Sequence, residues 1–213
     1  MGVGTAQTVV ADKPGSSRLT DDPACCDDVF DRDLLLHMVQ HAAREAKSSE
    51  SSIESVLGVT PEQLEIIASF VGMTIADLAA RRGAPTPDDE QLMLRELLMR
   101  HRSQPGEIGE WLACIIARRS MEPNHLWEDL GLPERPDLKR LLMRHFRSLA
   151  ANNTRNMRWK RFLYRAICES EGFTMCPSPT CDSCSEFHIC YSDESGPSAL
   201  ARNGHEGKPS VVE

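Results

Sequence analysis

The stretch Glu107-Ile-Gly-Glu-Trp-Leu-Ala-Cys-Ile-Ile-Ala-Arg-Arg-Ser120 indicates most clearly how this chain folds. Its large apolar residues recur at steps of three and four, which places them on one face of a helix. They are Trp111, Leu112, Ile115 and Ile116. The breaker pair Pro105-Gly106 precedes the stretch and Glu122-Pro123 follows it. We therefore predict a helix over 107–120 that contributes to a hydrophobic core.

Helical patterns of the same kind lie on both sides of this stretch. Thr60, Pro61 and Gln63 combine an N-cap, a proline at the first helical position and a capping-box partner, which is a strong helix start. No segment of useful length alternates apolar and polar residues with period two. The sequence therefore predicts an all-α fold. The predicted helices cover residues 28–47, 53–57, 61–71, 74–82, 90–103, 107–120, 125–130, 136–149 and 157–169.

The ends of the chain differ from its middle. Residues 1–26 are rich in Gly, Ser, Thr and Asp and lack an apolar period, so we expect a disordered N-terminal tail. We predict one helical domain over 27–175, an irregular cysteine-rich loop over 176–191 and a disordered tail over 192–213. No apolar run reaches the ~20 residues of a membrane helix, and the N-terminus lacks a secretory pattern. We therefore expect a cytoplasmic protein with no membrane partner.

Charge is unevenly distributed along the chain. Residues 91–165 hold 15 Lys and Arg against 8 Asp and Glu, a net charge of +7, whereas the rest of the chain carries −15. Such a basic segment can bind an anion or nucleic acid, and it can equally be a helical surface balanced by acidic ends. Several of its cationic groups lie near helix breaks, where they could gather an oxyanion. These candidates are Arg100, His101, Arg118, Arg119, His125, Arg144 and His145.

The segment Cys176-Pro-Ser-Pro-Thr-Cys181-Asp-Ser-Cys184-Ser-Glu-Phe-His-Ile-Cys190 places four thiols in the spacing Cys-x4-Cys-x2-Cys-x5-Cys. In a reducing compartment, clustered thiols are more often metal ligands than disulfides. A four-cysteine zinc site usually has two Cys-x2-Cys pairs, and this segment has one. The first three cysteines match a spacing that binds iron–sulfur clusters. An iron–sulfur cluster is therefore favoured, with structural zinc and unliganded thiols as alternatives.

Two residues near these thiols are further candidate metal ligands. Cys168 precedes the segment and His188 lies inside it, but the first could be a small buried hydrophobe and the second a solvated side chain. His37 and His41, four residues apart on a predicted helix, also have a spacing that can bind a metal. A solvated helix edge is the commoner arrangement for such a pair.

The predicted helices 61–71 and 74–82, joined by a turn at Gly72, have the outline of a helix-turn-helix DNA reader. Their surroundings are acidic, and the second helix carries its basic side chains, Arg81 and Arg82, only at its end. This favours a packed helical hairpin and no nucleic-acid partner. If the hairpin did bind DNA, the protein would be an iron–sulfur redox-sensing transcription regulator, which we keep as the alternative function. An electron-transfer ferredoxin is a third possible function.

Several uncommon strings follow one another between about residues 90 and 191. They are Ile116-Ala-Arg-Arg-Ser-Met-Glu-Pro-Asn-His-Leu-Trp-Glu-Asp-Leu-Gly-Leu132, Leu141-Leu-Met-Arg-His-Phe146, Asn153, Met157-Arg-Trp-Lys-Arg-Phe-Leu-Tyr-Arg165, Cys168-Glu169 and the terminal cysteine motif. Together they resemble the NifQ family of nitrogen-fixation proteins.

The resemblance implies a cofactor, namely an iron–sulfur cluster that contains molybdenum, bound by Cys176, Cys181, Cys184 and Cys190. It implies a protein that processes molybdenum and donates it to biosynthesis of the nitrogenase iron–molybdenum cofactor, as a metal carrier more than as a turnover enzyme. The implied partners are molybdate, the cofactor-assembly scaffold NifEN and the nitrogenase iron protein. We hypothesise that the Arg and His groups gather molybdate while the cysteine loop holds the cluster.

Overall fold

A computed structural model of the chain describes Met1 and residues 23–78 and 81–170. Throughout these ranges the regular structure is helical, apart from one isolated bridge between Ser52 and Arg81, so the all-α prediction is confirmed for them. The helices are α1 (Pro23–Ser48), α2 (Ile53–Leu57), α3 (Pro61–Phe70), α4 (Ile75–Leu78), α5 (Asp89–Arg100), α6 (Glu107–Arg119), α7 (Leu126–Asp129), α8 (Arg135–His145), α9 (Arg147–Ala150) and α10 (Trp159–Ser170).

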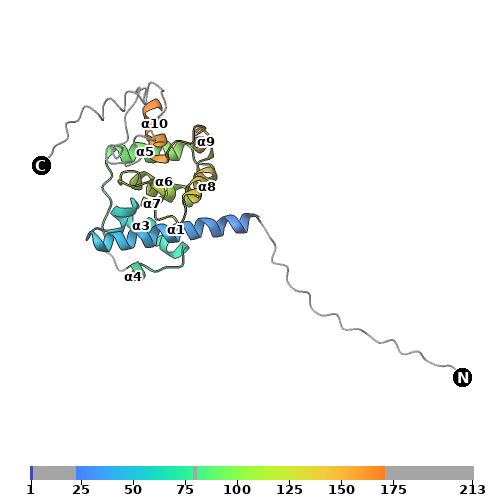
Figure 1. Cartoon of the computed structure of the whole chain (residues 1–213). Coiled ribbons are helices and arrows are strands. Elements are labelled where there is room, and N and C mark those ends of the chain that lie inside the picture. Colours follow the sequence, from blue (N-terminus) through green and yellow to red (C-terminus); the bar gives the residue numbers. More distant parts are fainter. Residues whose placement is uncertain (2–22, 79–80, 171–213) are drawn as a thin grey trace.

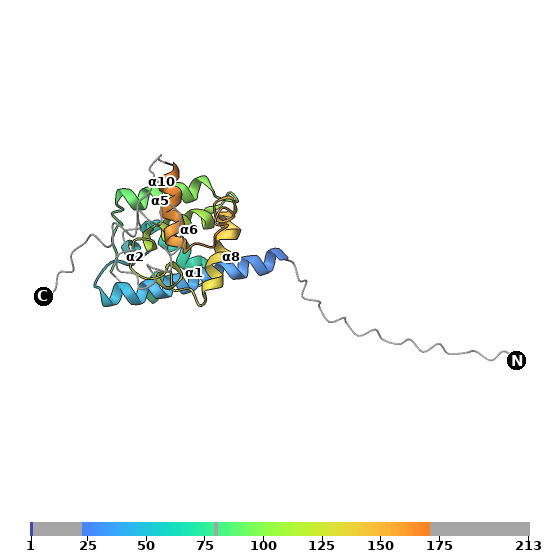
Figure 2. The same ribbon diagram turned by 45° about the horizontal axis from the view of Figure 1, so that its top comes forward.

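Helix α6 lies at the centre of the fold, between α5 on one side and α1 on the other (Figure 1). It packs directly against α5, α2 and α7, while α10 packs on α5 and α2 packs on α1. The turned view in Figure 2 shows α10 beside α5 and α8 beside α1. The predicted helix 107–120 is therefore confirmed, and it is the element around which the others assemble.

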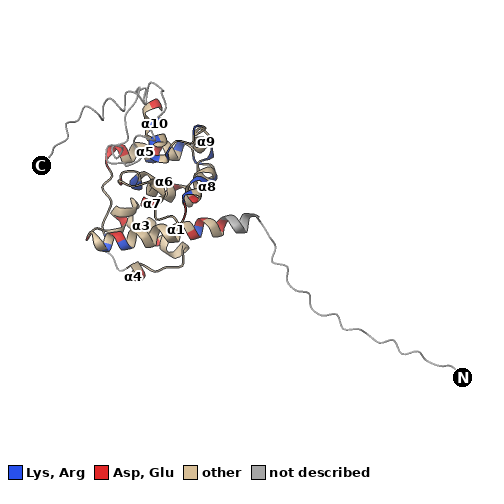
Figure 3. Cartoon of the chain, in the orientation of Figure 1, with Lys and Arg blue, Asp and Glu red and all other residues tan. Residues whose placement is uncertain are grey.

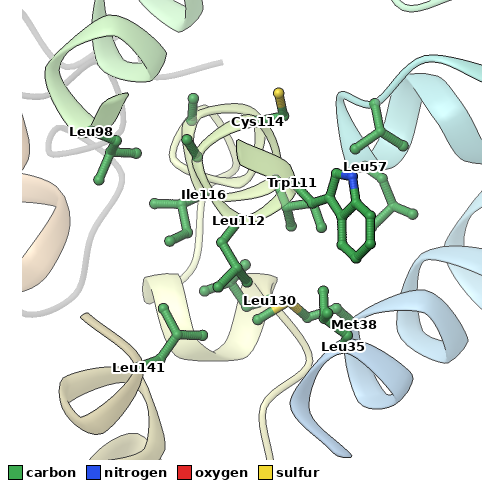
Figure 4. Close-up of a cluster of buried hydrophobic side chains, with 14 of the residues drawn as sticks. Leu35, Met38, Leu57, Leu98, Trp111, Leu112, Cys114, Ile116, Leu130 and Leu141 are labelled. Carbon is green, nitrogen blue, oxygen red and sulfur yellow. The ribbon is translucent and has the colours of Figure 1, made fainter. Parts of the chain in front are cut away.

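The side chains of α6 explain its central place. Every residue from Trp111 to Ala117 is buried, so this helix contacts neighbours all round rather than along one stripe. Figure 4 shows Leu112 pointing toward Leu130 and Leu141, with Leu35 and Met38 of α1 close by. The ring of Trp111 meets Phe70 of α3 edge to face, with 5.9 Å between ring centroids. Burial of this apolar surface is the main force that holds the helices together.

The predicted start of α3 is confirmed. The Thr60 hydroxyl accepts a hydrogen bond from the Gln63 amide at 3.2 Å, and the Gln63 side chain accepts one from the Thr60 amide at 3.0 Å. With Pro61 at the first helical position, two otherwise unpaired amides are satisfied and one residue has no amide to satisfy. Asp88 caps α5 in a similar way through the Gln91 amide.

The predicted helix over 136–149 is wrong in one respect, because the structure divides it into α8 and α9 at Phe146. Ser103, in the loop between α5 and α6, takes over hydrogen bonds at the break. Its amide donates to the His145 carbonyl at 2.8 Å, and its hydroxyl accepts from the Arg147 amide at 2.9 Å. The break lets the Phe146 ring lie fully buried in the core.

Two other predicted boundaries are also wrong. Helix α1 begins at Pro23, inside the range predicted as a tail. Helix α4 is described over Ile75–Leu78, and Arg81, inside the predicted helix 74–82, lies in the isolated bridge to Ser52. The reason is tertiary, since Arg82 forms an ion pair with the fully buried Glu54 of α2, and the Gly83 amide donates to the same carboxylate.

Three charged side chains, Arg119 of α6, Asp129 of α7 and Lys160 of α10, lie inside this helical core and form what we call the core polar network. The Lys160 ammonium donates to an Asp129 carboxylate oxygen at 2.5 Å and to the Glu122 carbonyl. The Arg119 guanidinium donates to the Asp129 carbonyl at 2.6 Å. Burial lowers the pKa of Lys160, while its interactions with Asp129 favour the charged form. The network joins α10 to the consecutive helices α6 and α7.

We expect Lys160→Met to destabilise the protein by about 3–5 kcal/mol, because it leaves the Asp129 carboxylate buried without its cation. Adding Asp129→Leu removes the orphaned charge and should restore part of that loss. Urea-induced unfolding of the single and double variants measures both effects. Lys139→Met on the exposed side of α8 is the control and should change stability by less than about 0.5 kcal/mol. A Lys160→Met protein as stable as the wild type would contradict this account.

Candidate functional site

The four thiols predicted to bind a metal cluster, Cys176, Cys181, Cys184 and Cys190, lie outside the described residues, as does His188. Within the described ranges, no group of three or more His, Cys, Asp or Glu side chains could hold a metal ion. The metal-binding role of the terminal thiols therefore stays a prediction from their spacing.

Cys168 lies in the last turn of α10, where it is buried. Its predicted role as a metal ligand stays a prediction. Cys114 of α6 is a buried free thiol, and burial raises its pKa. Cys114 is therefore a core residue without the properties of a reactive or metal-binding thiol.

Lys and Arg residues are frequent on the C-terminal part of α5 and on α8 and α9 (Figure 3). Two of the predicted oxyanion ligands, Arg118 and Arg119, lie apart from these at the end of α6. Arg119 is almost fully buried and forms a two-point ion pair with Glu45 of α1, at 2.6 and 3.1 Å. Arg118 donates to the Ser55 carbonyl and pairs with Glu122 at 2.7 Å. Both guanidinium groups thus connect helices and already have carboxylate partners.

Arg144 and His145 of α8 both contact Asp31 of α1. The Asp31 carboxylate is buried and accepts from Arg144 Nε at 3.0 Å, and it lies 2.8 Å from His145 Nε2. Burial alone would raise the pKa of Asp31, but the hydrogen bonds from His145 and Arg144 outweigh it, so the pKa lies below its usual value. This cluster holds α8 against α1, and the Arg144 guanidinium already has a carboxylate partner.

His125 begins α7 as its N-cap residue, and its amide donates to the Glu128 carboxylate at 3.0 Å. The remaining two predicted ligands, Arg100 and His101, lie at the C-terminal end of α5. The structure therefore distributes the seven predicted oxyanion ligands over separate places rather than bringing them into one cluster.

Arg100 and His101 line a cavity of about 390 Å³ between the end of α5, the α9–α10 loop and the end of α10, which we call the α5–α10 cavity. Apolar side chains from all three elements contribute to its walls, and His101 lies 2.8 Å from the Ser148 hydroxyl. The complete lining comprises Leu97, Arg100, His101, Leu149, Asn152, Asn153, Thr154, Arg155, Met157, Phe162, Arg165, Ala166, Glu169 and Ser170.

The α5–α10 cavity also contains two arginines that the sequence analysis missed, Arg155 and Arg165. Arg165 forms an ion pair with Glu169 at 2.6 Å, one helical turn away. Arg100 and Arg155 make no hydrogen bond or ion pair with any described residue. Only the excess of cations over residues 91–165 pointed to this region, because the pairing of α5 with the loop before α10 is a tertiary contact.

The cavity opens where the described part of the chain ends. Ser170 closes α10 and lines the cavity, and Cys176 follows six residues later in the sequence. A chain of six residues spans at most about 20 Å, so covalent geometry keeps the first of the four thiols within that distance of the cavity rim. The chain connection thus sets an upper limit of about 20 Å between Ser170 and Cys176.

Described helices arranged around α6, with a four-cysteine motif later in the sequence, define a class of helical protein with a cysteine-rich C-terminal segment. A model of the NifQ family matches residues 34–192, which include the core helices and all four thiols. The chain belongs to the NifQ family of nitrogen-fixation proteins, and the resemblance seen in its sequence strings is confirmed.

Curated relatives carry the same family name. The chain is 34% identical to the NifQ homolog of Sinorhizobium fredii (strain NBRC 101917 / NGR234) over 89% of its own length and 87% of that protein. It is 36% identical to NifQ of Rhodobacter capsulatus over 78% of its length and 92% of that protein. It is 44% identical to NifQ of Azotobacter vinelandii over about half of each chain. No solved structure matches the chain.

The described helices include none that is both long and apolar enough to cross a membrane.

The Asp31 cluster predicts a pH effect on stability. Because the folded pKa of Asp31 is lowered, its carboxylate stabilises the protein above the unfolded value of about 3.9, and this contribution is lost as the pH falls through the folded value. We therefore expect Asp31→Asn to be less stable than the wild type at pH 6 and to lose less stability on acidification below about pH 4. Thermal unfolding across this range measures the difference. Asp33→Asn, an exposed change on the same helix, is the control and should follow the wild type.

Proposed function

We propose that this protein carries an iron–sulfur cluster containing molybdenum and donates the molybdenum to biosynthesis of the nitrogenase iron–molybdenum cofactor. The observation that carries the proposal is the four-cysteine motif at 176–190, which lies inside the range matched by the NifQ family. Four thiolates spaced over so short a segment are the donor set that iron–sulfur clusters use.

The chemistry of molybdenum supports a thiolate carrier. Molybdate presents hard oxygen ligands, whereas the cofactor holds its metals in a sulfur-rich environment, so oxygen ligands must be exchanged for sulfur and the metal must be reduced. Soft cysteine thiolates suit the sulfur-bound form. In this proposal Cys176, Cys181, Cys184 and Cys190 hold the cluster, and the protein acts as a carrier rather than as a turnover enzyme.

The proposal includes the partners and location that the family resemblance implies. The scaffold NifEN would receive the molybdenum, and the nitrogenase iron protein would take part in the same assembly. Both would meet this protein in the cytoplasm, whose reducing conditions keep the four thiols available as ligands.

A transcription regulator is the weaker alternative. Its recognition helix would use Arg81 and Arg82 as base readers, but Arg81 lies in the isolated bridge to Ser52 and Arg82 is paired with Glu54. A gel shift with duplex DNA tests this alternative directly, and tight sequence-specific binding that changes on cluster oxidation would favour it over the carrier.

The carrier proposal is tested by metal analysis of the full chain purified without oxygen. We expect iron, sulfide and molybdenum in the wild-type protein, and a several-fold loss of molybdenum in Cys→Ala variants at 176, 181, 184 and 190. Cys114→Ala is the matched control, because that thiol is buried in the core and should leave metal content unchanged. Molybdenum that is unaffected by all four changes would sink the assignment of these thiols.

A further inference from the structure

Two arginines line the α5–α10 cavity without an anionic partner among the described residues, unlike three of the arginines predicted as oxyanion ligands. Arg118, Arg119 and Arg144 each have a carboxylate within 3.0 Å. Arg100 and Arg155 have none among the described residues. Like charges that line one cavity repel each other, so an anion that enters it gains attraction from both.

Helix electrostatics explain Arg100 but not Arg155. A cation in the last turn of α5 is favoured by the negative end of the helix dipole, so the position of Arg100 alone needs no ligand. Arg155 lies in the loop before α10, away from such a helix end, and still lines the same cavity. The negative end of the α5 dipole disfavours an anion. An anion site at this helix end therefore needs more than one guanidinium group.

The remaining walls fit a small oxyanion. Asn152 and Thr154 line the cavity beside Arg155 and add hydrogen-bond donors, while Leu97 and Phe162 supply apolar wall on the other elements. The Glu169 carboxylate also lines the cavity, but Arg165 neutralises it at 2.6 Å. At ~30 Å³ per water, a volume of about 390 Å³ holds roughly a dozen waters, so an oxyanion enters together with part of its hydration shell.

We propose that the α5–α10 cavity binds a tetrahedral oxyanion through the guanidinium groups of Arg100 and Arg155. Guanidinium groups recognise such anions by paired, charge-assisted hydrogen bonds. The identity of the anion rests on the proposed function, in which it is molybdate; the first predicted cluster thiol, Cys176, follows the cavity-lining Ser170 by six residues. In this proposal the cavity binds the anion before the anion is transferred to the thiols.

The experiment measures molybdate binding to the full chain carrying Cys→Ala at 176, 181, 184 and 190, so that thiol ligation cannot contribute. Equilibrium dialysis at low salt gives the dissociation constant for molybdate, with tungstate and sulfate as further probes. We expect Arg100→Ala and Arg155→Ala each to weaken binding about tenfold or more, the loss typical of one charged hydrogen bond. Arg95→Ala on the same helix, outside the cavity, is the matched control and should bind like the parent.

Unchanged affinity in the double variant Arg100→Ala, Arg155→Ala would overturn the proposal, and so would equal binding of chloride and the dianions. Equal binding of sulfate and molybdate would support an oxyanion site and remove its link to molybdenum. Both arginines are exposed, so the variants should fold, and their urea midpoints verify this.

The result is independent of the carrier test. Loss of molybdenum on changing the thiols, with no effect of the arginines on molybdate affinity, would keep the carrier function and remove this site. If molybdate binding depends on the arginines while the metal content is unchanged by the Cys→Ala variants, the oxyanion site is kept and the carrier function is removed.

Discussion

The core polar network places charge inside an apolar core, and the arrangement of the helices depends on it. Arg119 meets Glu45 of α1, the Val56 carbonyl at the end of α2 and the Asp129 carbonyl at the end of α7. Asp129 in turn holds Lys160 of α10. Charges removed from water are costly unless they are paired and hydrogen-bonded, so each of these helices must take up the position that satisfies its partners. Apolar burial around α6 favours compaction, and the network adds a requirement for one specific packing.

The same requirement explains several residues of one string in this chain. The string from Ile116 to Leu132 contains both Arg119 and Asp129, and its glycine packs where no side chain fits. Gly131 has a φ of +68°, and a Cβ there would lie 2.3 Å from the Cβ of His41. These residues therefore hold α1 against the loop after α7. Packing alone explains why they occur in the string, without any contact with a metal or substrate.

Local signals in the sequence were enough to predict several helix starts but not every interruption. The capping box at Thr60 and the proline after it act within four residues, so they can be seen without knowing the fold. The break at Phe146 depends on Ser103, which lies 44 residues from Arg147 and supplies hydrogen bonds that the helix would otherwise make for itself. Such a break has no local signal, because a serine in a distant loop produces it.

What the sequence alone determined is the all-α character, several of the caps and the spacing of four thiols, since each of these depends on residues close together in the chain. What only the tertiary structure decided is which cations are available to a ligand. Arg119 and Glu45 are 74 residues apart, and His145 and Asp31 are 114 apart, so their pairing could not be read from neighbouring residues. Carboxylates pair with Arg119 and His145, whereas Arg100 and Arg155 both line a cavity. The oxyanion ligands predicted from charge and helix breaks are thereby reduced to the small set around the α5–α10 cavity.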